Sequence, residues 1–434
     1  MMTMSMMVVM AQTNVSSAKT EALPSTVKIG FLYPKTGGLG SIGQGLMDGA
    51  QAAAYRINQT ETSYKVQIVA ADTATDAQTS ATAAQNLVSD GAVAIVGAAG
   101  SSDTLAAAGV TIPNQVPLIS YASTSPAITN LNDSDYVFRD VASDAYQGQA
   151  LVNLTLDQGV HHAYVLHMNN AYGNGVADQF IASYKAAGYN VSGQGAYDPT
   201  ASSFSSEVST LKSTSNIDGV VLVAYTEDGA KILAEAQTQA LTLPWFGTDG
   251  IKDPSVTNAS TTLATYLTGK LFGTVPSGPF NSSTNLAQQY YADLASTGGS
   301  YGVYGDYVYD AFLIVEAALN KAQSTDGPAL RDALYAAANG FKGATGPNKA
   351  FNCDGEPISQ TYDFWNATDG AAATMKVRAI TFNGLGTAAT APCGDHPYTG
   401  TFITAKSSPG FEYLAVLMVF SIVSIGYLKK RKYN

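Results

Sequence analysis

Charged residues and metal-binding residue types are scarce in this sequence. Its 434 residues include 2 cysteines and 4 histidines, and 13% of them are charged. The histidines form no H-x-x-x-H pair on a predicted helix, and the cysteines lack metal-ligand spacing. The net charge of −11 would repel the phosphate backbone of a nucleic acid. We therefore expect no metal site and no nucleic-acid partner.

The two cysteines, Cys353 and Cys393, leave two interpretations open. They form one disulfide if the chain is exported to an oxidising compartment, and they remain two free thiols otherwise. Eight N-x-[S/T] sequons suit an exported, glycosylated surface. They begin at Asn14, Asn58, Asn132, Asn153, Asn190, Asn258, Asn281 and Asn366. We therefore expect export and one disulfide.

Long hydrophobic runs are absent except near the C-terminus. Residues 413–428 read YLAVLMVFSIVSIGYL, and the basic run KKRK follows at once. This pattern predicts a transmembrane helix over residues 411–428 with a cytoplasmic tail over 429–434. The rest of the chain would then lie outside the cell membrane, held by this single-pass anchor. A buried core helix is the alternative.

The remaining terminal segments indicate targeting and tethering. Residues 1–11 resemble the end of a secretory signal but lack its charged start, which suggests a truncated signal segment. Residues 12–26 and 393–410 are rich in Ser, Thr, Ala, Pro or Gly, and we expect a tether and a linker there.

Short apolar runs alternate with amphipathic segments through most of the chain. Strands are predicted at residues 27–33, 65–72, 92–100, 116–123, 162–168, 190–197, 218–225 and 243–250. Helices are predicted between them, and two further helices at residues 301–323 and 327–340. Repeated strand–helix units predict an α/β fold with two doubly wound, Rossmann-like lobes. No further strands are expected to build a third domain.

The loop after the first predicted strand contains G-x-G-x-x-G at residues 38–43, the pattern of dinucleotide-binding enzymes. Residues 34–36 separate the strand from the first glycine, and Asp72 comes too late to bind a ribose. The spacing therefore excludes this motif. No Ser/His/Asp order or carboxylate pair points to catalysis either, so we expect neither an enzyme nor a cofactor.

Four loops follow predicted strands: GGLGSIG, GAAGSSDT, SYASTSP and GTDG. Ligands of open parallel sheets bind at the carboxyl ends of the strands. Three of these loops offer hydrogen-bond donors and one offers an acid, a combination that suits a zwitterion.

These segments, in this order, resemble type I periplasmic binding proteins, and within them the leucine/isoleucine/valine-binding proteins of ABC importers. The resemblance covers about residues 27–392 and includes the stretches IGFLYPKTGGLGSIGQGLMDGAQAAAYRIN, LVSDGAVAIVGAAGSSDT, VPLISYASTSPAIT, VFRDVASDAYQGQA, NNAYGNG and PWFGTDG. It implies two lobes joined by three crossovers, near Val141, at 275–279 and at 346–352. The lobes would comprise residues 27–140 with 280–346, and 141–275 with 350–392.

The resemblance implies that one lobe holds the carboxylate of an amino acid. Ser101 or Ser102 would bind it after the third strand, and Thr124 after the fourth, with Ser123 adding backbone contacts. Each has a simpler interpretation, because Ser101 also caps a helix and Thr124 precedes a Ser-Pro turn.

The second lobe would hold the ammonium group through Asp249, although an Asp-Gly pair is also an ordinary turn. Tyr172 and Tyr225 match aromatic residues that contact the ligand in the family. Without the resemblance, Tyr172 would be interpreted as an aromatic residue of a surface loop. Ile42 stands where the family usually has an aromatic residue, which leaves the side-chain specificity open.

The expected function is amino-acid capture by lobe closure, most readily of a branched-chain amino acid. The implied partners are the amino acid and an ABC permease in the membrane, and the chain would be a monomer or a weak dimer. An amide or urea-like ligand is an alternative, as is a surface receptor or structural protein without a transport role. The C-terminal SPGFEYLAVLMVFSIVSIGYLKKRK also resembles the PGF-type anchoring signals of archaeal surface proteins.

Overall fold

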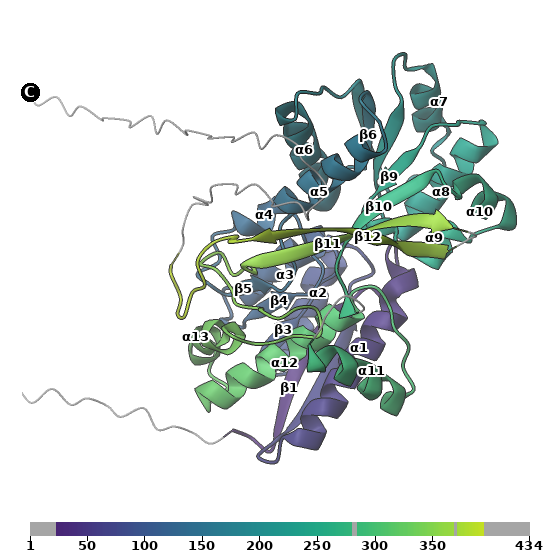
Figure 1. Ribbon diagram of the computed structural model, residues 1–434. Coiled ribbons are helices and arrows are strands. Elements are labelled where there is room, and N and C mark those ends of the chain that lie inside the picture. Colours follow the sequence, from purple (N-terminus) through teal and green to yellow (C-terminus); the bar gives the residue numbers. More distant parts are fainter. Residues whose placement is uncertain (1–22, 280–283, 369–370, 395–434) are drawn as a thin grey trace, which may run out of the picture.

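Two sheets of mainly parallel strands organise the chain into two lobes (Figure 1). The computed structural model describes residues 23–279, 284–368 and 371–394. The first sheet has the strand order β2 (Lys65–Asp72), β1 (Thr26–Tyr33), β3 (Ala94–Val96), β4 (Leu118–Ser120) and β5 (Val137–Arg139), all parallel. The predicted two-lobed α/β fold is confirmed.

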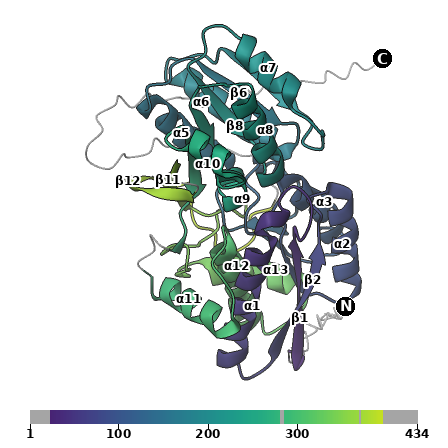
Figure 2. The same ribbon diagram turned by 90° about the vertical axis from the view of Figure 1, so that its right-hand side faces the viewer.

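The second sheet has seven strands in the described part of the chain. Their order is β12 (Ala371–Asn383), β11 (Ser359–Thr368), β10 (Leu271–Pro276), β9 (Trp245–Gly247), β8 (Gly219–Val223), β6 (Ala163–Met168) and β7 (Gly193–Tyr197). The last five are parallel, whereas β11 runs antiparallel to β10 and β12. The β11–β12 hairpin lies between the lobes in both ribbon views (Figures 1 and 2).

Strands β10 to β12 are additional to the strands predicted from the sequence. They extend the second sheet instead of building a third domain. Polar residues interrupt the apolar ones in β11, SQTYDFWNAT, although most of its positions are buried. The hydrophobic pattern of β11, which pairs along one edge of an existing sheet, is therefore too weak to predict a strand.

Four helices of the first lobe lie between its strands: α1 (Gly43–Thr60), α2 (Ala77–Ser89), α3 (Ser101–Thr111) and α4 (Pro126–Thr129). Three later helices return to this lobe, where α11 and α12 pack against α1 and α13 packs against α12. They are α11 (Asn285–Thr297), α12 (Gly305–Ala322) and α13 (Gly327–Ala338). The second lobe carries α5 (Asp144–Asp157), α6 (Ala171–Ala186), α7 (Ser205–Ser213), α8 (Thr226–Thr238), α9 (Pro254–Thr257) and α10 (Thr261–Leu267).

Local sequence explains where several of these helices begin. Asp76, Ser143, Asn170 and Asp326 each accept a hydrogen bond from a backbone N–H in the first turn that follows. A short polar side chain before an apolar segment satisfies N–H groups that have no partner within the helix. The fold therefore positions helix N-termini directly after strand ends, where a ligand site is expected.

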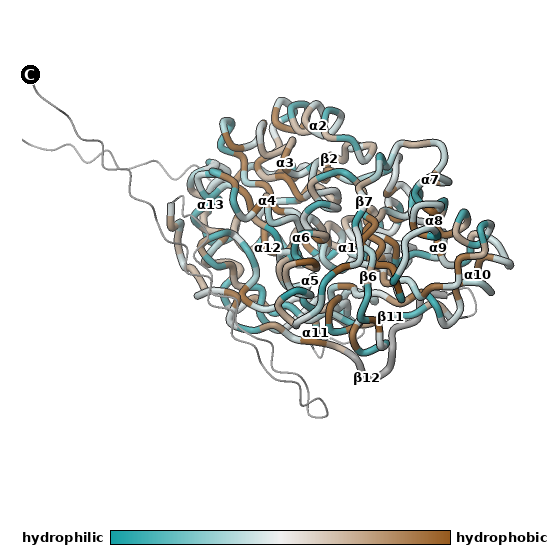
Figure 3. Tube along the Cα trace, turned by 90° about the horizontal axis from the view of Figure 1, so that it is seen from above, coloured by the Kyte–Doolittle hydropathy of each residue, from teal (hydrophilic) through white to brown (hydrophobic). Residues whose placement is uncertain are grey.

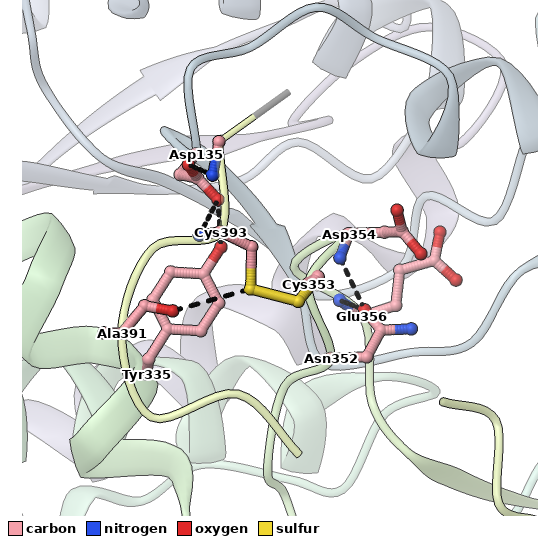
Figure 4. Close-up of a disulfide and its surroundings, with 9 residues drawn as sticks. Asp135, Tyr335, Asn352, Cys353, Asp354, Glu356, Ala391 and Cys393 are labelled. Atoms are coloured by element: carbon pink, nitrogen blue, oxygen red, sulfur yellow. Dashed lines mark hydrogen bonds between the residues drawn. A yellow bond between two sulfur atoms is a disulfide. The ribbon is translucent and has the colours of Figure 1, made fainter. Parts of the chain in front are cut away.

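The chain passes from one sheet to the other after β5, after β10 and between α13 and β11. The segment after β12 then returns to the first lobe, where Cys393 forms a disulfide with Cys353 (Figure 4). Asp135 accepts hydrogen bonds from the backbone N–H of Cys393 (3.2 Å) and Gly394 (2.8 Å), and from the hydroxyl of Tyr335 (2.8 Å). The disulfide therefore holds the end of the described chain beside β5.

The glycine-rich loop after β1 is organised by the Asp72 carboxylate. The Asp72 carboxylate accepts the backbone N–H groups of Lys35, Thr36 and Ala74. Gly37 has φ +84, and a Cβ there would lie 2.0 Å from the carbonyl oxygen of Ala74. Glycine is therefore required for this tight packing.

One hydrophobic core cluster runs through both lobes, and a smaller one lies between the first sheet and helices α2 and α3. Strand β6 is buried at every position, and its surroundings are coloured as hydrophobic in Figure 3.

Within residues 23–279, 284–368 and 371–394, no helix is both long and apolar enough to cross a bilayer. The predicted transmembrane helix at 411–428, the tail at 429–434, most of the linker and the signal segment lie outside the described residues.

Candidate functional site

A narrow cavity lies between the lobes at the carboxyl ends of the strands. It is lined by Leu39, Ile42, Ala99, Ala122, Tyr172, Tyr225, Thr226, Asp249, Gly250, Lys252, Val303 and Tyr304. The centre of a water molecule can occupy about 20 Å³ of it, roughly the room for one water. The cavity therefore brings together Ile42, Tyr172, Tyr225 and Asp249 from the sequence prediction.

Asp249 lies in the short turn η2 (Asp249–Ile251) that follows β9, and it is 7% exposed. Its Oδ1 accepts hydrogen bonds from the Gln147 amide (2.5 Å) and the Tyr172 hydroxyl (3.0 Å), and its Oδ2 accepts one from the Tyr304 hydroxyl (2.9 Å). Burial raises the pKa of Asp249, and these hydrogen bonds oppose that rise. Asp249 is thus a buried carboxylate held by three uncharged donors.

Asp144 is a second acid beneath the cavity, at the start of α5. Its carboxylate is fully buried and neither oxygen has a hydrogen-bond partner of normal geometry. Burial, followed by the charge of Asp249, raises the pKa of Asp144 well above its ordinary value. The two acids together make this side of the site strongly electronegative when both are ionised.

Two tyrosines form an aromatic wall on the second lobe. The rings of Tyr172 in α6 and Tyr225 before α8 are stacked, with centroids 5.3 Å apart and planes 14° from parallel. The Tyr172 hydroxyl also donates to Thr248 Oγ1 at 2.6 Å. The two rings therefore have a fixed position beside Asp249, and the Tyr172 hydroxyl is hydrogen-bonded to Thr248 and Asp249.

The predicted serines of the first lobe lie behind the cavity surface, which Ala99 and Ala122 supply. Ser123 Oγ bonds to the carbonyl oxygens of Ala98 and Ala99 at 3.1 Å, so its side chain faces its own lobe. Ser101 Oγ accepts the backbone N–H of Ser125 at 3.2 Å. These side chains brace the loops, which leaves backbone groups and the start of α3 to face the cavity.

Thr124 and Ser102 behave differently from these two serines. Thr124 Oγ1 is buried and forms no hydrogen bond of normal geometry, although it lies near enough to Asp144 to lower the pKa of that acid. Ser102 Oγ accepts the backbone N–H of Ala171 on the opposite lobe at 3.3 Å. Thr124 therefore adds its hydroxyl to the surroundings of Asp144, whereas Ser102 is a contact between the lobes.

The lobes are joined across the rim of the cavity. The Thr226 hydroxyl donates to the carbonyl oxygen of Gly38 at 2.9 Å, and the Ser41 hydroxyl donates to Thr226 Oγ1 at 2.9 Å. On another rim, the Ser125 hydroxyl donates to the carbonyl oxygen of Ala171 at 2.7 Å. These bonds describe a closed arrangement, and they give the glycine-rich loop a role in closure.

Sequence reasoning missed Asp144, Gln147, Lys252 and Tyr304. Asp144 and Gln147 are three residues apart and therefore share one face of α5, which is the signal that could have paired them. Tyr304 precedes α12, far from the other site residues in sequence, and gives no such signal. Among the described residues, no cluster of His, Cys, Asp and Glu is suited to holding a metal ion.

Known proteins resemble this chain in sequence and in fold. A model of the family described as periplasmic binding protein matches residues 26–372. An uncharacterized protein of Methanocaldococcus jannaschii is 26% identical over 306 residues, which cover 67% of this chain and 72% of that protein. The chain also matches metabotropic glutamate receptors but spans only 19% of the length of rabbit receptor 6.

Two solved structures share the whole two-lobed arrangement. A leucine-binding protein of Thermotoga maritima superposes with a TM-score of 0.73 at 23% identity, over 82% of this chain and 99% of the other. A branched-chain amino acid transporter substrate-binding protein of Streptococcus pneumoniae, in complex with isoleucine, gives 0.70 at 24% identity, over 81% and 99%. At these identities the likeness concerns the fold. With the family model matching most of its length, this chain belongs to the periplasmic binding protein family, with the type I fold.

Proposed function

We propose that this protein is the extracytoplasmic solute-binding component of an ABC importer and that it captures an amino acid, most readily a branched-chain one, by lobe closure. The observation that carries the proposal is the buried carboxylate of Asp249, which faces the interlobe cavity opposite the serine- and threonine-rich loops of the first lobe.

Opposite sides of the cavity favour opposite charges on the ligand. The first lobe offers the N-terminus of α3 and the Thr124 hydroxyl, both of which favour a carboxylate. The second lobe offers Asp249, with Asp144 beneath it, and both favour an ammonium group. A zwitterion satisfies both sides at once, and a simple anion or cation satisfies only one.

The remaining lining of the cavity is suited to an aliphatic side chain of the ligand. Leu39, Ile42, Ala99, Ala122 and Val303 line it beside the tyrosines. Burying a side chain of the size of leucine or isoleucine against such a surface contributes about 1.5–3 kcal/mol. Ile42 in place of an aromatic residue leaves a different shape for that side chain, so we expect its preference among aliphatic amino acids to differ from that of relatives with an aromatic residue there.

Lobe closure is needed because the cavity is small and the rims are joined. About 20 Å³ of room for water centres does not admit an amino acid, so the lobes must separate for ligand to enter. The lobes then close again around the ligand in a cavity wider than the present one, and the ligand shifts the equilibrium by its greater affinity for that closed, ligand-filled arrangement. The hydrogen bonds of Thr226 and Ser41 across the rim would break and re-form in each cycle.

Attachment to a membrane and delivery to an ABC permease complete the proposal. Residues 411–428 would anchor the chain, or a lipid would replace them after processing, with the binding lobes outside the cell. Extraction of membranes with alkaline carbonate, comparing the full chain with one ending at residue 410, tests this part. Equal release of the two chains would argue against an anchor.

A ligand panel tests the binding function. We expect at least one branched-chain amino acid to raise the thermal midpoint of the purified full-length chain, because a ligand at 100 times its Kd stabilises a protein by about 2.7 kcal/mol. Stabilisation by amides or urea alone would favour that alternative ligand class. No stabilisation by any compound would favour a receptor or structural role.

Asp249→Ala tests the residue on which the proposal rests. Removing one partner of a buried charge pair costs about 3–5 kcal/mol, so we expect amino-acid affinity to fall at least about a hundredfold by calorimetry. Asp178→Ala, at an exposed acid on α6, is the matched control and should bind as the unaltered chain does. Unchanged affinity in Asp249→Ala would remove Asp249 from the site.

A further inference from the structure

A second cavity lies beside the first, on its hinge side. It is lined by Lys252, Val275, Pro276, Gly278, Tyr301, Val303, Tyr304, Asp306, Tyr307 and Asp363. Lys252, Val303 and Tyr304 line both cavities and so form the wall between them. The second cavity also offers about 20 Å³ to water centres, which is room for one small polar group.

Asp306 is the unusual feature of this second cavity. It lies in the first turn of α12, it is 1% exposed, and neither of its carboxylate oxygens has a hydrogen-bond partner of normal geometry. A buried carboxylate without such partners is costly, and such groups are generally paired in proteins. A donor placed in the cavity would supply what the surrounding chain does not.

Gly278 keeps this cavity open. A Cβ at this position would lie 2.9 Å from the Tyr301 hydroxyl and 3.1 Å from Asp306 Oδ2. Gly278 does not have a positive φ, so its backbone conformation does not itself demand glycine. Glycine at position 278 therefore leaves space in front of the Asp306 carboxylate.

The charges around the cavity leave one acid in excess. Lys252 is its one cationic lining residue in the described chain, and Asp306 and Asp363 are its two acids. Burial raises the pKa of Asp306 to about 8 and nearby Asp310 adds to the rise, whereas the backbone N–H groups of Asp306 and Tyr307 at the start of α12, and then Lys349, oppose it. An incoming cation would stabilise the ionised carboxylate and release its proton to solvent.

We propose that this second cavity is a side-chain subsite, in which Asp306 accepts hydrogen bonds from an N–H donor at the end of the captured amino acid's side chain. The inference rests on the proposed function, since the amino acid's own ammonium and carboxylate groups stay at Asp249 and the first-lobe loops. It adds amino acids with a terminal ammonium, guanidinium or amide group to the branched-chain amino acids of the proposed function.

The Tyr304 side chain provides the connection between the two cavities. Its hydroxyl donates to Asp249 Oδ2 at 2.9 Å, and its ring packs edge-on against Tyr307 at 5.4 Å between centroids. A ligand ammonium that takes over Asp249 Oδ2 releases this hydroxyl, and Tyr304 can then turn aside. The same binding event that fixes the main chain of the ligand thus opens the way for its side chain.

An isosteric ligand pair tests the subsite on the full-length chain. Ornithine matches norleucine, except that an ammonium group replaces the terminal methyl group. We expect ornithine to bind at least tenfold more tightly than norleucine in calorimetry. Equal or weaker binding of ornithine would overturn the inference.

Two variants test whether the preference for ornithine over norleucine arises in this cavity. Asp306→Leu should abolish the tenfold preference while norleucine affinity stays within about threefold, and Gly278→Ala should reduce the preference with Asp306 still present. Asp178→Asn is the exposed control and should keep the preference. A preference that survives both Asp306→Leu and Gly278→Ala would overturn the inference.

The test also separates the two proposals. A chain that binds norleucine and ornithine equally well would overturn the subsite alone and leave the proposed function standing. A chain that binds no amino acid of the panel would overturn both.

Discussion

The two walls of the interlobe cavity are built in opposite ways. On the first lobe, Ser101 and Ser123 are bonded to the backbone of their own lobe, so the wall is a rigid set of backbone groups. On the second lobe, Asp249 is held by side chains from α5, α6 and the loop before α12. The first wall is therefore held by bonds within its own lobe, whereas the second is built around an acid that can exchange its partners.

This difference suggests that the two walls act at different steps of ligand binding. A fixed wall can receive a ligand while the lobes are apart, because its loops are already held in place and lose little entropy on binding. The acid on the second wall must instead trade bonds with Gln147, Tyr172 or Tyr304 for bonds with the ligand. The second wall therefore controls closure, and the first wall controls initial docking.

Arg139→Met should give the largest effect, because Arg139 supports the first wall from behind. Its buried guanidinium pairs with Glu356 and donates to the carbonyl oxygens of Ser123 (3.3 Å) and Ser125 (2.9 Å). Removing one partner of a buried ion pair costs about 3–5 kcal/mol, so the urea midpoint of unfolding should fall markedly.

A double variant is the control for this prediction. Arg139→Met with Glu356→Leu removes both charges and should regain part of the loss, since no charge is left buried alone. If Arg139→Met unfolds at the same urea concentration as the unaltered chain, the first wall does not depend on this support.

The walls also differ in how far sequence reasoning could predict them. The resemblance to periplasmic binding proteins placed Asp249, Tyr172 and Tyr225 at one site, and all three line the cavity and follow strand ends or begin helices. Tyr304 and Asp306 reach the site only because α12 returns to the first lobe, a long-range packing event with no local signature. The inward rotation of Ser123 depends on a single side-chain torsion, which no sequence pattern encodes.

Asp144→Asn should change the pH dependence of stability, which tests the ionisable character of the second wall. The pKa of Asp144 is raised in the folded chain, so the folded state binds a proton more tightly than the unfolded state does. Its stabilising contribution is complete below the unfolded pKa near 4 and is lost as pH rises through the folded pKa. One such group gives a slope of up to about 1.4 kcal/mol per pH unit.

We therefore expect the thermal midpoint of the unaltered chain to fall between pH 5 and pH 8, and the fall to be shallower in Asp144→Asn. Asp178→Asn, at an exposed acid, should keep the original slope. A stability of the unaltered chain that rises with pH over this range, or an unchanged slope in Asp144→Asn, would contradict the assignment.

The smallest effects distinguish two neighbours on the first wall, Ser123 and Thr124. Ser123→Ala removes a buried hydroxyl that bonds to two carbonyl oxygens, so stability should fall by about 1–2 kcal/mol with ligand affinity unchanged within twofold. Thr124→Val removes a hydroxyl that has no regular partner, so stability should stay within about 0.5 kcal/mol while affinity falls about five- to tenfold. Calorimetry and urea unfolding on both variants measure the two quantities. The reverse pattern, with affinity lost in Ser123→Ala and stability lost in Thr124→Val, would mean that the serine side chain turns toward the ligand and the threonine serves the fold.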